Sequence, residues 1–209
     1  MATTNEELVD ELIRGGYLKN PALIDAFREI KREDFVPEEF KEEAYVNAPL
    51  PIGEGQTISQ PLTVAFMLEL LLPQPGERIL DVGTGSGWQA ALLAHTVGEN
   101  GKVIAIERIE ELKIMAETNI NKYKSLVPRI DIILGDGSKG YEEEAPYDKI
   151  IAAAAAEEVP AAWKEQLKTG GTIVAPVGAS VVVMSKINAE RFETREYYGF
   201  SFVPLILDK

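Results

Sequence analysis

The sequence predicts an α/β fold, with a doubly wound and mostly parallel sheet, because short apolar runs alternate with helical patterns along most of the chain. Residues 78–82, 102–107 and 130–134 are three such runs, and each ends beside an acidic residue or a glycine-rich loop. Open α/β sheets bind ligands at the carboxyl ends of their strands. The three loops therefore predict one pocket at one edge of the sheet. With 209 residues, the chain is long enough to bury one full core.

The segment before the first strand predicts a helical extension. Two stretches within it have the apolar spacing of amphipathic helices, and Asn20-Pro21 supplies a cap and a first-turn proline for the second of them. A later stretch is rich in proline and glycine and predicts irregular backbone. The expected elements are helices over residues 5–15, 21–32 and 38–43, an irregular stretch over 44–55, and a helix from Gln60-Pro61 to about Leu72.

The rest of the chain alternates strand and helix and then ends in strands. Residues 181–186 and 192–207 flank a turn near Asn188-Ala189, so they predict an antiparallel pair. The sheet should therefore be mostly parallel, with antiparallel pairing at its C-terminal end. The other expected strands cover residues 78–82, 102–107, 130–134, 148–154 and 171–175, and the helices between them cover 88–97, 109–123 and 160–167.

The composition excludes several kinds of site. The chain has no cysteine and one histidine, His95, so thiolate zinc sites, cysteine nucleophiles and histidine-rich metal sites are excluded and no metal is expected. The formal net charge of -13 argues against nucleic acid as a partner, because phosphate binding needs clustered lysine and arginine. No apolar run is long enough to span a membrane, and the first residues are polar and acidic, so we expect a cytoplasmic protein with no membrane partner.

The loop after the first strand is the strongest indication of a ligand. Gly83, Gly85 and Gly87 let the backbone turn sharply and approach a ligand closely. Dinucleotide loops have the spacing G-x-G-x-x-G, whereas this loop is G-x-G-x-G preceded by Asp81. It resembles the loop of S-adenosylmethionine methyltransferases, whose ligand has an ammonium group that suits the Asp81 carboxylate. The alternative is a tight turn with no ligand.

Acidic residues after the next two strands extend the same pocket. Glu107 ends the second strand, where a carboxylate can bind both hydroxyls of a ribose. Asp136 and Gly137 follow the third strand, where the acid can accept the exocyclic amine of adenine and the glycine leaves room for the ring. Taken singly, Glu107 is also consistent with a solvated strand end, and Gly135-Asp136-Gly137 with a simple turn.

The segment before the first strand carries a more specific resemblance. Pro49-Leu50-Pro51-Ile52-Gly53-Glu54-Gly55-Gln56-Thr57-Ile58-Ser59-Gln60-Pro61 resembles the active-site motif of protein-L-isoaspartate O-methyltransferases. Further blocks continue the resemblance in order over nearly the whole chain. They are Asp34-Phe35-Val36-Pro37, residues 81–87, Gly135-Asp136-Gly137 with Gly140, residues 145–148, Val159-Pro160, residues 166–168 with Gly170-Gly171, Pro176-Val177-Gly178 and residues 202–205.

The resemblance implies a Rossmann-like class I methyltransferase fold and an activity. The enzyme would transfer the methyl group of S-adenosylmethionine to the α-carboxylate of an L-isoaspartyl residue and release S-adenosyl-L-homocysteine. Its partners would be damaged isoaspartyl-containing proteins and peptides, and we expect a monomer. The resemblance also implies one domain over residues 1–209, with the helical extension and active-site loop in 1–60 and the cofactor-binding core in 61–209.

The resemblance assigns roles by position. Ser59 is the catalytic residue, between cofactor and substrate carboxylate. The expected cofactor contacts are Thr57 and Ile58 along its length, Gly83, Gly85 and Ser86 at its methionine part, Glu107 at its ribose, Asp136 and Gly137 at its adenine, together with Asp81, Gly87 and Arg108.

Alternatives to these assignments stay open at the level of the sequence. Thr57 and Ser59 also suit capping of the helix that begins at Gln60-Pro61. Another methyltransferase, acting on RNA or a small molecule, would share the glycine loop but has no reason to keep residues 56–59. A binding module that has lost turnover predicts damage to the loop or to Ser59, and both are intact.

Overall fold

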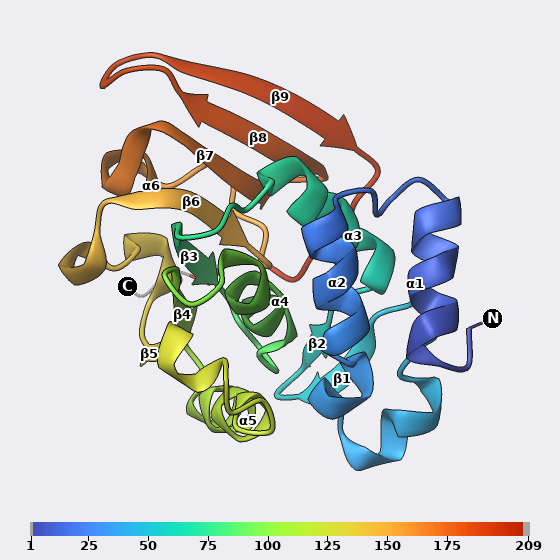
Figure 1. Ribbon diagram of the computed structural model, residues 1–209. Coiled ribbons are helices and arrows are strands. Elements are labelled where there is room, and N and C mark those ends of the chain that lie inside the picture. The colour runs from blue at the N-terminus through green and yellow to red at the C-terminus, as the bar shows by residue number, and fades with distance from the viewer. Residues whose placement is uncertain (1, 207–209) are drawn as a thin grey trace.

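The structure of the protein is a computed structural model that describes residues 2–206 and is organised around a seven-stranded sheet (Figure 1). The strand order is β5-β4-β3-β6-β7-β8-β9, and β3 to β7 are parallel to their neighbours within that group. β8 runs antiparallel to β7, and β9 antiparallel to β8. The mostly parallel, doubly wound sheet is therefore confirmed. Its strands are β3 (Arg78–Val82), β4 (Lys102–Glu107), β5 (Ile130–Leu134), β6 (Tyr147–Ala152), β7 (Leu167–Val177), β8 (Ser180–Lys186) and β9 (Phe192–Tyr198).

Apolar side chains alternate between the two faces of the sheet, and each face is covered. Ile79 belongs to the core beneath the N-terminal helices, whereas Leu80 belongs to the core that contains Trp163 of α6. This alternation gives the central parallel strands two buried faces, which explains why β3 and β4 are mainly apolar and almost wholly buried, whereas the edge strand β9 is polar and mostly exposed. The α-helices are α1 (Asn5–Arg14), α2 (Pro21–Glu29), α3 (Pro61–Leu71), α4 (Trp88–Val97), α5 (Glu110–Ile120) and α6 (Ala161–Gln166).

The N-terminal helices begin where their caps predict. The Thr4 side chain accepts a hydrogen bond from the amide of Glu7, and the Asn20 side chain accepts one from the amide of Ala22. α2 ends at Glu29 rather than at residue 32, since Ile30 leaves the helical region. Short 3-10 helices follow at η1 (Arg32–Phe35) and η2 (Glu38–Glu43).

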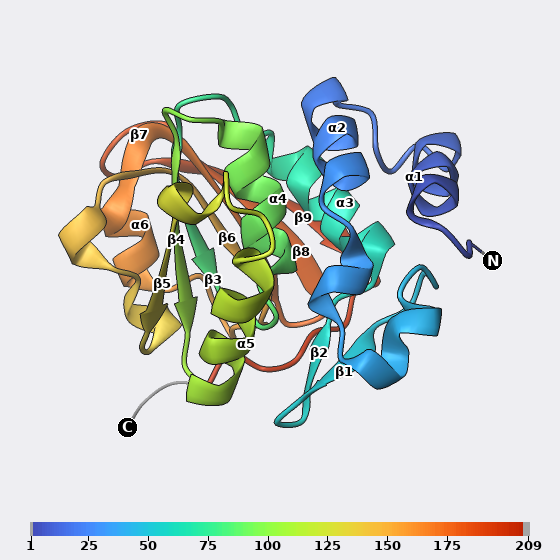
Figure 2. The same ribbon diagram turned by 60° about the horizontal axis from the view of Figure 1, so that its bottom comes forward.

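Residues 44–55 were expected to be irregular, and this expectation is wrong for their second half. β1 (Leu50–Gly53) and β2 (Gln56–Ile58) form an antiparallel hairpin. Its turn contains Glu54 with a positive φ of 52°, between two glycines that also have positive φ. Figure 2 shows the hairpin beside the end of the sheet toward which the arrows of β3 and β4 point. The hairpin thus brings residues 56–59 to the carboxyl edge of the sheet.

The expected strand over residues 192–207 is also too long. β9 ends at Tyr198, and Gly199 turns the chain with a φ of 97°. The tail then runs back beside the segment after β6, where Ala155 donates to the carbonyl of Val203 and Leu205 donates to the carbonyl of Ala155. Residue 207 lies outside the described residues.

The helical extension and the sheet share one hydrophobic core. Trp88, the first residue of α4, packs edge to face against Phe27 of α2 with ring centroids 5.5 Å apart. Its indole N–H donates to the carbonyl of Ile30 over 3.2 Å. A buried aromatic pair therefore fixes α2 on α4, and the two helices lie side by side in Figures 1 and 2.

No helix within residues 2–206 is long and apolar enough to cross a membrane. The boundary drawn at residue 60 between extension and core stays a prediction from the sequence.

The shared core generates a test of stability. Replacing Phe27, which is 1% exposed, with alanine is expected to cost about 3–5 kcal/mol of unfolding free energy, because it opens a cavity between α2 and α4. Urea unfolding followed by both circular dichroism and tryptophan fluorescence should show one transition at a lower midpoint. Tyr198→Ala is the control, since Tyr198 is 77% exposed and its loss should change stability by at most about 0.5 kcal/mol. If Phe27→Ala shifted only an early, partial transition, the extension would be a separate folding unit.

Candidate functional site

Three cavities lie at the carboxyl edge of the sheet, and they differ in the segments that line them. The strand-end cavity lies between the loops after β3, β4 and β5, the β1–β2 hairpin and the C-terminal tail. The loop cavity lies between the glycine loop, the start of α4 and residues 57–59. The surface cavity opens beside the start of α3. It is lined by Pro49, Thr57, Ser59, Gln60, Thr63, Ala153, Ser201, Phe202 and Val203.

The three cavities meet at the same residues. Thr57, Ser59 and Ala153 line all of them. Thr57 lies in β2 and Ser59 directly follows it, whereas Ala153 directly follows β6. The three cavities therefore adjoin one another at these two hydroxyl-bearing residues.

The glycine loop after β3 lines the strand-end cavity and the loop cavity. Gly83 and Gly85 line both of them and have positive φ angles of 77° and 54°. The amides of Gly83 and Thr84 both donate to the carbonyl of Ile106 at the end of β4. Ser86 lines the loop cavity, and Gly87, with a φ of 92°, is the N-cap of α4. The turn needs glycine here because other residues rarely adopt these angles.

Asp81 lies inside the protein, below the glycine loop. Its carboxylate is fully buried and accepts hydrogen bonds from the Thr84 hydroxyl over 2.9 Å and from the Gln89 amide over 2.7 Å. Burial raises the pKa of Asp81 to about 6, and the two hydrogen bonds act in the opposite direction. Asp81 lines none of the three cavities, although Thr84 and Gln89 line the loop cavity. In this structure the carboxylate ties the loop to α4.

Glu107 connects the strand-end cavity to the glycine loop. One carboxylate oxygen accepts a hydrogen bond from the amide of Gly85 over 2.9 Å. The other accepts hydrogen bonds from the amides of Arg108 and Ile109 over 2.8 and 3.0 Å. Its side chain lines the cavity, as does that of Arg108. An acid is therefore fixed at the position where the sequence predicts one.

The loop after β5 brings only one of its two expected residues to the strand-end cavity. Gly137 lines the cavity, and a Cβ at this position would clash with Val82. Asp136 does not line it, because its carboxylate accepts hydrogen bonds from the amide and hydroxyl of Ser138 over 2.9 and 2.6 Å. The indole of Trp163 donates to the carbonyl of Gly137 over 2.8 Å and holds the loop from the face of the sheet that α6 covers.

The hydroxyls of Thr57 and Ser59 do not cap α3. The N-cap residue is Gln60, and no side chain of the cap makes a capping hydrogen bond. The amide of Leu62 is instead bound by the Asn47 side chain over 3.0 Å. The capping alternative is therefore wrong, and Ser59 lines all three cavities. Ile58 is buried and reaches only the loop cavity.

Sequence reasoning missed two parts of the walls. Ala153, in the alanine run that follows β6, lines all three cavities, although no role for it was predicted from the sequence. The signal was present, because β6 is parallel to β3 and its carboxyl end lies at the same edge. The tail residues 203–206 also line the strand-end cavity. They were expected in a strand. Their place in the cavity wall follows from the tail running back beside Ala155, which the sequence did not predict.

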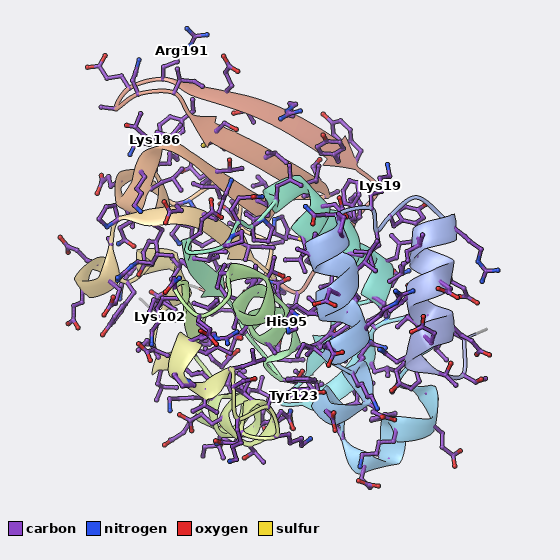
Figure 3. The ribbon with its side chains drawn as sticks, viewed as in Figure 1. Lys19, His95, Lys102, Tyr123, Lys186 and Arg191 are labelled. Carbon is purple, nitrogen blue, oxygen red and sulfur yellow. The ribbon has the colours of Figure 1, made fainter. Side chains whose placement is uncertain are left out.

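His95 lies apart from these cavities. It sits in α4 and its ring nitrogen lies 2.9 Å from the Asp25 carboxylate of α2, with the ring directed toward that helix in Figure 3. Among the residues that the structure describes, no cluster of acids or histidine suits a metal ion. The site is thus built from backbone amides, hydroxyls, Glu107 and apolar walls.

Comparison with known proteins gives consistent results. Residues 3–209 match the family model described as protein-L-isoaspartate (D-aspartate) O-methyltransferase. Proteins named protein-L-isoaspartate O-methyltransferase include one from Methanopyrus kandleri, 44% identical over 96% of this chain and 90% of the relative. Another, from Ignicoccus hospitalis, is 44% identical over 99% of both chains.

Solved structures agree on the fold. A structure from Plasmodium falciparum, in complex with S-adenosyl-L-homocysteine, superposes with a TM-score of 0.88 over 98% of this chain and 99% of that chain, at 24% identity. A second structure, described as a protein-L-isoaspartate O-methyltransferase, gives a TM-score of 0.85 at 27% identity and covers 96% of this chain and 65% of that chain. The Rossmann-like methyltransferase fold implied by the sequence is confirmed.

The buried Asp81 generates a pH-dependent prediction for the ligand-free protein. Because its pKa is raised from 3.8 to about 6, the folded state keeps a proton that the unfolded chain releases between those two values. The contribution of Asp81 to stability should therefore fall by a total of about 3 kcal/mol as the pH rises from about 4 to 6. Asp81→Asn should lack this slope. Urea unfolding at steps from pH 4 to 7 measures the difference between the two proteins, and a difference that stays constant over this range would contradict the raised pKa.

Proposed function

The chain belongs to the protein-L-isoaspartate (D-aspartate) O-methyltransferase family, and on this premise we propose that it methylates the α-carboxylate of L-isoaspartyl residues in damaged proteins and peptides. The methyl donor is S-adenosylmethionine, and the product is S-adenosyl-L-homocysteine. One observation carries the proposal above all. A cavity suited to a nucleoside and a cavity open to the surface meet at the hydroxyls of Thr57 and Ser59.

The strand-end cavity and the loop cavity together fit the methyl donor. In the strand-end cavity, Glu107 would bind the ribose hydroxyls, and the adenine ring would lie against Gly137, which has no side chain to obstruct it. The loop cavity has glycine backbone on one side, which suits an amino-acid tail. When bound, S-adenosylmethionine supplies a methyl group on a positively charged sulfur. The other proposed contacts are Thr57, Ile58, Gly83, Gly85, Ser86, Gly87 and Arg108.

We assign the two remaining acids a supporting role alongside their predicted contacts. Asp81 holds the glycine loop through Thr84 and Gln89, and Asp136 holds Gly137 in place through Ser138. Direct contact of Asp81 with the ammonium group, and of Asp136 with adenine, stays a prediction. Movement of the Gln89 amide would expose the Asp81 carboxylate to the loop cavity, which Gln89 lines.

The surface cavity suits a carboxylate that must remain reactive. Its walls within the described chain include four hydroxyl side chains, Thr57, Ser59, Thr63 and Ser201, and no lysine or arginine. A carboxylate with a pKa of about 3.5 is already ionised at neutral pH, so no general base is needed. The Ser59 hydroxyl would donate to one oxygen and orient the other, without the strong pairing that a cation would impose. Positioning of this kind can contribute about 7–11 kcal/mol to catalysis.

Methylation of the isoaspartyl carboxylate begins a repair. The backbone amide nitrogen that follows attacks the methyl ester, methanol leaves and a succinimide forms, and water then opens this ring in part to a normal aspartyl residue. The match over the whole chain, including residues 49–61, favours this substrate over RNA or a small molecule. The cytoplasmic location and the monomeric state stay predictions from the sequence.

The function is tested by transfer of labelled methyl from S-adenosylmethionine to two peptides that differ only in containing isoaspartate or aspartate. We expect label on the isoaspartyl peptide, in a base-labile ester. Equal labelling of the two peptides, or labelling of neither, would contradict the proposal. The assay separates the repair enzyme from a protein that only binds the cofactor, since binding of S-adenosyl-L-homocysteine can be measured in the same sample.

The role of Ser59 is tested by Ser59→Ala. Loss of one hydrogen bond to a charged oxygen should lower kcat about 10- to 100-fold, with little change in affinity for S-adenosyl-L-homocysteine. Thr63→Ala is the matched control, because Thr63 lines only the surface cavity and its loss should mainly affect the KM for peptide. A Ser59→Ala enzyme with nearly normal kcat would remove Ser59 from its assigned role.

A further inference from the structure

Arg32, at the start of η1, is one of the largest fully buried side chains of the protein and has no exposed surface. Its guanidinium group donates only to backbone carbonyls. One terminal nitrogen donates to Ala44 over 2.8 Å and to Val46 over 3.2 Å. The other donates to Ala48 over 2.9 Å and to Ser59 over 3.1 Å. One side chain thus binds four carbonyls of the segment that builds the site.

This arrangement is costly for a residue that serves packing alone. No acidic side chain forms an ion pair with Arg32 within residues 2–206, and its Nε atom has no hydrogen-bond partner there. The guanidinium lies 5.6 Å from the ring centroid of Trp88, so part of its charge faces an aromatic ring. Burial lowers the pKa of Arg32 to about 9, which leaves it protonated at neutral pH. An apolar side chain of similar size is often as good as a buried charge for stability.

The position of the four carbonyls explains what the charge can do. Ala48 lies just before β1, and Ser59 lies just after β2. One terminal nitrogen therefore binds the carbonyls at both ends of the hairpin, while the other terminal nitrogen of the rigid, planar guanidinium holds the segment that leads into it. Pro49 and Ser59 are both walls of the surface cavity, and Ser59 is a wall of all three cavities. The backbone that carries the Ser59 hydroxyl is held by Arg32 itself.

We propose that Arg32 is a positioning residue for methyl transfer, which sets the Ser59 hydroxyl and the Pro49 wall at the junction of the donor and acceptor cavities through hydrogen bonds to the carbonyls of Ala48 and Ser59. This inference rests on the proposed function. Arg32 lines none of the three cavities, so it acts through the backbone and touches neither substrate nor cofactor.

Lys186 provides a matched control for a role in folding alone. It is also a buried cation that donates to backbone carbonyls, those of Lys164 over 2.6 Å and Leu167 over 2.7 Å. Leu167 begins β7, which is parallel to β6, so these carbonyls lie at the amino end of the parallel strands, opposite the site. In Figure 3 Lys186 lies beside α6, away from His95 of α4. Its loss removes the same kind of interaction at a distance from Ser59.

The test compares Arg32→Lys, Arg32→Met and Lys186→Met with the unchanged protein. Each is assayed with an isoaspartyl peptide at a temperature where circular dichroism shows full folding. Rates are divided by the concentration of sites that bind S-adenosyl-L-homocysteine in calorimetry, which removes any effect of a smaller folded fraction. We expect Arg32→Met to lower kcat about 100-fold and Arg32→Lys about 10-fold, because the single nitrogen of an ammonium has three donors and cannot bind all four carbonyls, and small misplacements are costly. Affinity for S-adenosyl-L-homocysteine should change little, and Lys186→Met should keep kcat within about twofold.

The possible results have distinct meanings. Normal kcat per binding site in Arg32→Lys and Arg32→Met would overturn the inference, as would an equal loss in Lys186→Met. If Arg32→Met does not fold, the graded loss in Arg32→Lys decides the question. Failure of the unchanged protein to label the isoaspartyl peptide would contradict the proposed function itself, and the inference with it.

Discussion

The reversal of the chain at the carboxyl end of β3 is the constraint on which the rest of the site depends. β3 lies at the centre of the parallel strands, with β4 on one side and β6 on the other. Backbone hydrogen bonds tie its end to both neighbours, from Gly83 to Ile106 and from Ala153 to Val82. Glu107 then binds the amide of Gly85 across the top of the loop. The loops that line the cavities are therefore held mainly by backbone hydrogen bonds, so a change of side-chain rotamer alone does not move them.

The second half of the site comes from the N-terminal extension, and Trp88 joins the two halves. This residue begins α4 directly after the glycine loop, packs on Phe27 and donates to the carbonyl of Ile30. Its ring also faces the guanidinium of Arg32, which holds the backbone at Ser59. The glycine loop and the segment that carries Ser59 are thus connected through one buried cluster. The extension and the sheet therefore share the contacts that hold the site.

The sequence predicted the parallel strands and the edge at which the site lies, because their signal is local. Apolar runs that end in Asp81, Glu107 and Gly135-Asp136-Gly137 identify both strand and loop. The β1–β2 hairpin was missed because its strands are short and contain Pro51 and Gly53, which favour irregular backbone. The roles of Ala153, the C-terminal tail and Arg32 were missed for another reason. They depend on contacts between distant parts of the chain, and no pattern of neighbouring residues encodes these contacts.

The central claim is that donor and acceptor meet at the Ser59 hydroxyl, and a crystal structure with both S-adenosyl-L-homocysteine and an isoaspartyl peptide tests it most directly. The account predicts the sulfur beside residues 57–59 at the glycine loop, with the peptide entering through the surface cavity. Its α-carboxylate should accept a hydrogen bond from the Ser59 hydroxyl. A carboxylate that faced the sulfur from another direction, out of reach of Ser59, would contradict the account.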